Sequence, residues 1–148
     1  MVMDKEIERF EEHFQIIRKS AGWSADEFGE RIGVTRQTIN NIENKKYKLT
    51  KSLYLLSRYV LEQEIETHPD ETEMLKVILD VFVDHPDKYS QKTKDKIYQE
   101  TNLLSPAIKT KNSNRKEVSK EWKAILVGLS VIASSAIAAI AISSWRKK

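Results

Sequence analysis

The sequence predicts an all-α protein whose last helix crosses a membrane. Apolar residues recur three and four positions apart in the segments before that helix, which is the spacing of one helix face. No segment shows sustained alternation of apolar and polar residues, and no Asn-Gly or Asp-Gly pair marks a hairpin. Near the C-terminus, the 22 residues Ala124–Trp145 carry no charge, which is the length of a bilayer span.

Composition excludes several classes of site. The chain has no Cys, so the sequence predicts no disulfide, no thiolate metal site and no Cys nucleophile. Its three His are scattered, and its four Gly form no phosphate-binding loop, so we expect no metal, no cofactor and no enzymatic activity. The N-terminal segment is charged and unlike a signal peptide, which predicts that the body of the protein stays in the cytoplasm.

Charge is distributed unevenly along the chain. Residues 1–66 carry 11 basic and 12 acidic groups, and residues 67–105 carry 5 and 8. Residues 106–148 carry 9 basic and 2 acidic groups. The pI of about 9.0 is therefore a property of the C-terminal part and does not by itself indicate a nucleic-acid partner.

The first predicted helix runs from about Asp4 to Ala21. Its apolar stripe recurs at intervals of three and four residues and comprises Ile7, Phe10, Phe14 and Ile17. Gly22 supplies the C-terminal stop.

Two short helices are predicted next, joined by a sharp turn. Ser24 and Glu27 have the spacing of a capping box, and Gly33 ends the first of the two helices. Thr35 is placed to cap the second. Hydrophobic staples are expected around both caps, from Trp23 with Phe28 and from Val34 with Ile39. Gly29 lies inside the first helix, where a small residue allows a crossing helix to come close.

The predicted fourth helix and a second helical pair follow. The fourth helix, about Thr50 to Glu66, is expected to bury Leu53, Leu56, Val60 and Leu61. In residues 67–105, Asp70 with Glu73 can cap a helix that His85-Pro86 ends, and another helix covers about Gln91 to Leu104. The apolar face of the first helix of this pair comprises Met74, Leu75, Ile78, Leu79 and Phe82. Residues 106–121 are polar and basic, which predicts a linker.

The stretch from Trp23 to Lys46 resembles the helix-turn-helix of the phage-repressor (Cro/CI-like) or XRE family. The matching residues are Gly29, Ile32, Gly33, Val34, Ile39 and Ile42, with Arg18 and Glu43 at positions that pair in that family. The resemblance covers roughly residues 10–65 and implies a lambda-repressor-like bundle that binds double-stranded DNA. One departure is Lys45, which stands where the family often has Gly.

The second motif helix carries the predicted reading residues. With Ile39 and Ile42 facing inward, a step of 100° per residue points Gln37, Asn41 and Asn44 outward. Arg, Gln and Asn are the side chains that recognise guanine and adenine edges in the major groove. The predicted base contacts, partly from the family comparison, are Arg36, Gln37, Thr38, Asn40 and Asn41. The predicted phosphate contacts are Thr35, Lys45, Lys46 and Lys48, with Lys51 as a further candidate.

The uncharged run predicts a membrane anchor over residues 122–148. Trp122 and Trp145 bracket it at about the separation of the two membrane interfaces. Six Lys or Arg occupy the 20 residues before the run and three follow it, which predicts a single pass through the cytoplasmic membrane with the N-terminus inside. Rows of Ser and Ala four residues apart would also permit close helix–helix packing and a homodimer.

Together these patterns predict a membrane-anchored transcriptional regulator. It has a DNA-binding domain (1–66), a helical pair for dimerisation or partner contact (67–105), a linker (106–121) and an anchor (122–148). Three alternatives remain open. The run could be a buried helix of a soluble core. The motif could bind a cytoplasmic protein, as in membrane adaptors of the RodZ type, or the chain could be a small immunity or antitoxin component.

Overall fold

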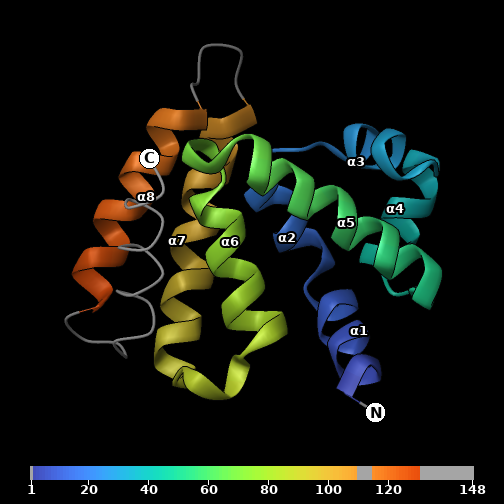
Figure 1. Cartoon of the computed structure of the whole chain (residues 1–148), viewed down its shortest axis with the longest axis horizontal. Helices are drawn as coiled ribbons and strands as arrows, with labels where there is room; N and C mark the ends of the chain where they lie inside the picture. The colour runs from blue at the N-terminus through green and yellow to red at the C-terminus, as the bar shows by residue number, and fades with distance from the viewer. Residues whose placement is uncertain (1, 110–114, 131–148) are drawn as a thin grey trace.

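The computed structural model describes residues 2–109 and 115–130, and every regular element in them is helical (Figure 1). The first five helices are α1 (Val2–Glu12), α2 (Phe14–Ala21), α3 (Ala25–Ile32), α4 (Arg36–Glu43) and α5 (Lys51–Thr67). They are followed by η1 (Pro69–Glu71), α6 (Glu73–Leu79), η2 (Asp80–Asp84), η3 (Pro86–Lys88), α7 (Gln91–Lys109) and α8 (Arg115–Ser130).

The helices form two groups that share one core. Figure 1 shows α6, α7 and α8 side by side on the left, α3 and α4 on the right, and α5 running across the front. Helix α2 packs against both α6 and α7, so no break in packing marks the boundary predicted at residue 66. The buried cluster extends continuously from Phe10 in α1 to Trp122 in α8.

Two arginines reinforce this connection between the groups. Arg58 of α5 makes a bidentate pair with Asp84 of η2, with nitrogen–oxygen distances of 2.8 and 2.5 Å. The Nε of Arg9 in α1 donates to the carbonyl oxygen of Val83, 2.7 Å away. Because both arginines reach η2, this one turn is held by α1 and α5 at once.

The predicted first helix is divided at His13 into α1 and α2. Its apolar stripe is confirmed, because Phe10, Phe14 and Ile17 are buried and Ile7 packs against them. His13 has non-helical backbone angles, and its ring lies 4.8 Å from the ring of Phe82. The break occurs where α1 turns toward η2, a long-range contact that the local sequence does not encode.

Helix α5 agrees with the predicted bounds and is capped by Thr50, but its buried face differs from the prediction. Tyr54, Ser57, Leu61 and Glu64 face the core. The prediction that Leu56 lies inside is wrong, because its side chain is exposed. The inward face lies along the 54–57–61–64 line, so the Leu55-Leu56 pair is on the opposite side of the helix.

The second helical group follows the prediction in its core and departs from it at one end. Its five predicted apolar core residues are all buried, and the break at His85-Pro86 is confirmed. The predicted Asp70–Glu73 cap is wrong. Glu73 is instead fully buried, with its Oε1 3.6 Å from the Nζ of Lys123 in α8.

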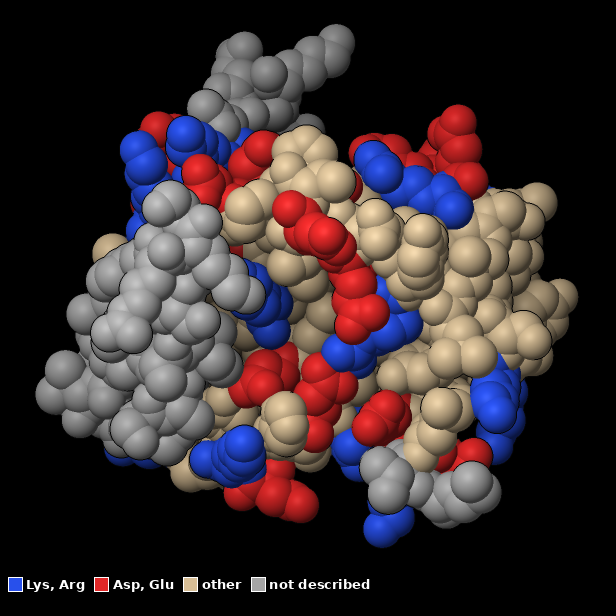
Figure 2. Space-filling view, in the orientation of Figure 1, with Lys and Arg blue, Asp and Glu red and all other residues tan. Residues whose placement is uncertain are grey.

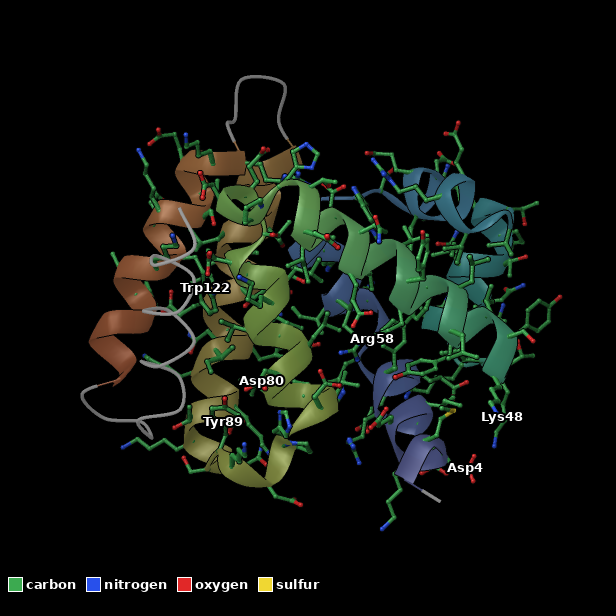
Figure 3. All side chains as sticks on the ribbon, viewed as in Figure 1. Asp4, Lys48, Arg58, Asp80, Tyr89 and Trp122 are labelled. Atoms are coloured by element: carbon green, nitrogen blue, oxygen red, sulfur yellow. The ribbon has the colours of Figure 1, made fainter. Side chains whose placement is uncertain are left out.

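Within the segment 106–121, which was predicted as a linker, α7 continues to Lys109 and α8 begins at Arg115, while residues 110–114 lie outside the described residues. Helix α8 packs against η1, α6 and α7, and it buries Val118 and Trp122. Trp122 lies on the side of α8 that faces its neighbours (Figure 3). It therefore belongs to the helical core.

Arg115, the first residue of α8, fixes the start of this helix. Its guanidinium lies 2.5 Å from Oε2 of Glu64 and 3.2 Å from Oε1 of Glu71. It also donates to the carbonyl oxygen of Ala21, 3.1 Å away at the end of α2. Three earlier elements are thus joined to α8 by one side chain, which explains why this basic segment packs against the rest of the fold.

No helix in the described ranges is both long enough and apolar enough to span a bilayer. Most of the uncharged run, from residue 131 onward, lies outside those ranges, and so does Trp145.

Candidate nucleic-acid interface

The turn between α3 and α4 is built from local capping interactions, as predicted. The Ser24 side chain accepts from the backbone N–H of Glu27, and the Glu27 side chain accepts from that of Ser24, which completes the capping box. Thr35 caps α4 by accepting from the backbone N–H of Thr38. The rings of Trp23 and Phe28, 5.7 Å apart between centroids, form the predicted staple.

Two glycines allow the sharp turn. A Cβ at Gly29 would lie 2.6 Å from the carbonyl oxygen of Val34, so only glycine permits this approach of the turn to α3. Gly33 has φ of +76°, in the left-handed region that glycine adopts readily. The angle between α3 and α4 is therefore fixed by backbone contact.

The predicted pair of Arg18 and Glu43 is present beneath the motif. The two side chains make a bidentate contact, with nitrogen–oxygen distances of 2.6 and 3.1 Å. A third nitrogen of Arg18 donates to the carbonyl oxygen of Trp23 at 2.9 Å. Since Arg18 is on α2 and Glu43 is on α4, this buried pair holds the second motif helix against the core.

The outer face of α4 exposes the first two predicted reading residues. The side chain of Arg36 is 66% exposed, and its nearest acidic group, Asp26, is 3.9 Å away. Gln37 is exposed, while Thr38 and Asn40 are half-buried at the sides of the same face. The donors of Arg36 and Gln37 lie in the first turn of the helix, which is the part that enters the major groove in helix-turn-helix proteins.

Asn41 does not point outward as expected, because it is buried. Its Oδ1 accepts from Nε2 of Gln37 at 3.1 Å. Its backbone carbonyl accepts from the N–H groups of Lys46 and Tyr47, at 2.7 and 3.2 Å. The loop after α4 thus folds back over Asn41, a contact that a helical wheel does not include.

That loop exposes the predicted phosphate contacts. Lys45, Lys46 and Lys48 are exposed, and Figure 3 shows Lys48 at the edge of the molecule, near the N-terminal end of α5. Lys45 has φ of +63°, so it adopts the left-handed conformation for which glycine is favoured. This explains why a glycine is common at this position in similar motifs.

Sequence reasoning missed one exposed residue in this loop. Tyr47 is 55% exposed and lies between Lys46 and Lys48. An aromatic residue inside a basic loop was the available signal, because Tyr hydroxyls are among the groups that contact DNA phosphates.

Comparison with known families agrees with this geometry. Residues 14–58 match the family model described as Helix-turn-helix. The match begins with α2 and ends inside α5, so it contains the capped turn, the Arg18–Glu43 pair and the exposed face of α4. This segment is a helix-turn-helix domain. Searches of curated proteins and of solved structures returned no match for the chain.

Proposed function

We propose that this protein is a sequence-specific DNA-binding regulator, held at the cytoplasmic membrane by its C-terminal apolar run. The observation that carries the proposal is the outer face of α4, where Arg36 and Gln37 project from a rigid helix-turn-helix. The matched family model supports the DNA-binding part of the proposal. The sequence of the run, without charge from Ala124 to Trp145, supports the membrane part.

The reading chemistry is assigned to the first turn of α4. Arg36 can donate to O6 and N7 of guanine, and Gln37 can make the paired contacts that recognise adenine. Because Asn41 is buried and binds the Gln37 amide, we assign it the role of orienting Gln37, in place of a base contact of its own. Thr38 and Asn40, at the sides of the face, complete the proposed base-reading set.

Phosphate contacts are assigned to both ends of α4. Lys45, Lys46 and Lys48 are exposed in the loop after the helix, and Thr35 is exposed at its start. Contacts of this kind position the protein without reading sequence, and each neutralised phosphate adds to the salt dependence of binding.

The membrane part of the proposal is refined by α8. Ile125 is the last residue of α8 whose side chain packs against the helical core, so we propose a span beginning at Leu126. Leu126–Trp145 contains 20 residues, enough for the roughly 30 Å of a bilayer core at 1.5 Å per residue. Six Lys or Arg lie in the 20 residues before this span and three follow it, which favours a cytoplasmic N-terminal side.

The adaptor alternative requires a protein partner on the same motif. The cores of protein–protein interfaces are enriched in aromatic residues and depleted in charged ones. The outer face of α4 is instead polar and basic, which favours DNA for that helix.

Selection from a randomised DNA duplex pool with the full chain in detergent tests the DNA-binding part. We expect enrichment of one sequence, in two copies about one helical turn apart if the protein binds as a dimer. Recovery of random sequence alone would contradict it. For the membrane part, carbonate-washed membranes should retain the full chain and release a variant that lacks Leu126–Lys148.

A further inference from the structure

A buried carboxylate on α5 connects α8 to the helix-turn-helix. Oε2 of Glu64 lies 2.5 Å from the guanidinium of Arg115, the first residue of α8. Oε1 of the same side chain lies 3.9 Å from the guanidinium of Arg31 in α3, and Nδ1 of His68 also approaches Oε2, at 3.5 Å. The guanidinium of Arg31 covers the ring of Trp23 at the start of α3, 4.3 Å from its centroid. Arg115 therefore reaches the first motif helix through a shared partner.

A second connection runs through the junction between α2 and α3. On one side, Arg115 donates to the carbonyl oxygen of Ala21 at 3.1 Å. On the other side, Arg18 donates to the carbonyl oxygen of Trp23 at 2.9 Å. Because Arg18 also binds Glu43 of α4, contiguous contacts join the start of α8 to the helix that carries the proposed reading residues. Figure 2 shows acidic and basic side chains next to one another at the upper left, where Figure 1 places the start of α8.

The surface that α8 buries is partly polar. Besides Val118 and Trp122, it buries Ser119 and Lys123, and the Nζ of Lys123 lies 3.6 Å from Oε1 of Glu73. The hydroxyl of Ser119 and the indole Nε1 of Trp122 make no hydrogen bond within the described residues. Buried ion pairs add little net stability, and buried polar groups without hydrogen bonds cost free energy. Helix α8 is therefore easier to separate from the core than an apolar helix of the same length.

We propose that α8 is a releasable latch that holds the helix-turn-helix in the geometry that reads DNA. When α8 is docked, Arg115 fixes the junction before α3 and, through Arg18, the position of α4. When α8 separates, the contacts of Arg115 with Glu64 and Ala21 are lost, and the reading face loses its fixed orientation. DNA then binds the docked state more tightly, and by linkage DNA binding favours docking by the same factor.

This latch deepens the proposed function, because it names the regulation of the same DNA site, and it rests on the DNA-binding part of that function. The proposed span begins within α8, at Leu126, so α8 is the helix through which the membrane part of the protein acts on the motif. Figure 1 shows α8 at the left and α4 at the right of the molecule. An effect of α8 on DNA affinity therefore acts through the fold and not through a direct contact with DNA.

Amide hydrogen exchange of the full chain in detergent, without DNA, tests the connection between α8 and the motif. Arg115→Ala should speed exchange in α8 and in residues 21–43 by roughly fivefold or more, because both lose the same contacts. Arg115→Lys keeps the charge but reaches fewer acceptors, and its effect should be intermediate. Faster exchange confined to α8 would overturn the proposal.

Two controls separate the latch from a general loss of stability. Lys120→Ala changes a residue of α8 whose side chain is 64% exposed, and it should alter exchange in neither region. Val83→Ala opens a cavity in η2, which is separated from Glu71 and Arg115 by the length of α6. It should speed exchange without favouring α8 and residues 21–43 over the other helices.

DNA binding gives a readout that a merely structural role of Arg115 would not change. Arg115→Ala should bind the selected DNA sequence roughly fivefold or more weakly than the parent, while Lys120→Ala and Val83→Ala should bind as the parent does. In the parent, the selected duplex should slow exchange in α8 by a similar factor, although α8 does not touch it. Equal affinity of the parent and of an Arg115→Ala protein whose α8 exchanges freely would overturn the proposal.

The outcomes separate this proposal from the function that it serves. If the parent selects no DNA sequence, the proposed function falls, and the exchange pattern without DNA decides whether α8 holds the motif. If the parent selects a sequence and release of α8 leaves its affinity unchanged, the latch falls and the proposed function stands.

Discussion

Helices α4 and α8 both begin with an arginine, and the two arginines have opposite surroundings. The side chain of Arg36 is 66% exposed and has one carboxylate at 3.9 Å. The side chain of Arg115 is 17% exposed and contacts two carboxylates and a carbonyl oxygen. Donors that are already satisfied within the fold hold elements together, whereas donors that face water remain available for a ligand. The comparison therefore separates a structural arginine from one whose donors are available to a ligand.

The rest of each helix follows the same division. Helix α8 buries Trp122 and Lys123, although the sequence around them is strongly basic. Helix α4 buries Ile39 and Ile42 on one side and leaves a polar row on the other. Changes in α8 should therefore act on stability first, and changes on the outer face of α4 should act on binding alone.

The largest expected effect is the loss of Trp122. Its indole is fully buried between α8 and the rest of the core, so Trp122→Ala should lower the free energy of unfolding by about 3–5 kcal/mol. Urea unfolding followed by circular dichroism measures this. Tyr98→Ala is the control, because Tyr98 is 40% exposed, and its effect should be clearly smaller. Equal losses would mean that α8 does not pack as described.

Removal of Arg115 should have an intermediate effect. Arg115→Ala leaves Glu64 and Glu71 without their closest cation, so we expect a loss of about 1–3 kcal/mol in unfolding free energy. Arg36→Ala, the matched change at the start of α4, should alter stability by less than about 0.5 kcal/mol. If the two variants unfold at the same urea concentration, the contrast between the two arginines is lost.

The smallest expected effect concerns the loop after α4. Lys45→Gly should raise the free energy of unfolding by up to about 1 kcal/mol, because glycine adopts the positive φ of this position without strain. Lys46→Gly should not stabilise the protein, since only Lys45 among the described non-glycine residues has a positive φ. A lower unfolding temperature for Lys45→Gly than for the parent would contradict this assignment.

Sequence reasoning succeeded where the interactions are local. The Ser24 capping box, the Thr35 cap and the stop at Gly33 each depend on residues within a few positions, and all are present. The Arg18–Glu43 pair is long-range, and it was accessible only through the family resemblance.

Long-range packing explains the errors. The residues next to Trp122 in the sequence do not indicate that α8 packs against α6 and α7. Because Trp122 lies beside an uncharged run, the sequence predicted that it marks a membrane interface. Long-range packing also explains why the loop after α4 covers Asn41 and why Leu56 lies on the exposed side of α5. In each case the exposure of a residue was predicted from its own helix alone, whereas its burial depends on a distant element.

The central claim is that the outer face of α4 reads DNA sequence, and it is tested most directly by Arg36→Ala and Gln37→Ala. Both variants should fold as the parent does by circular dichroism. Binding to the selected DNA sequence, measured by fluorescence anisotropy, should weaken by about 1–3 kcal/mol, with relaxed preference at one base position for each variant. Lys46→Ala should weaken binding to all sequences alike and reduce the salt dependence by about one phosphate. Folded Arg36→Ala and Gln37→Ala proteins that bind the selected sequence as tightly as the parent would contradict the claim.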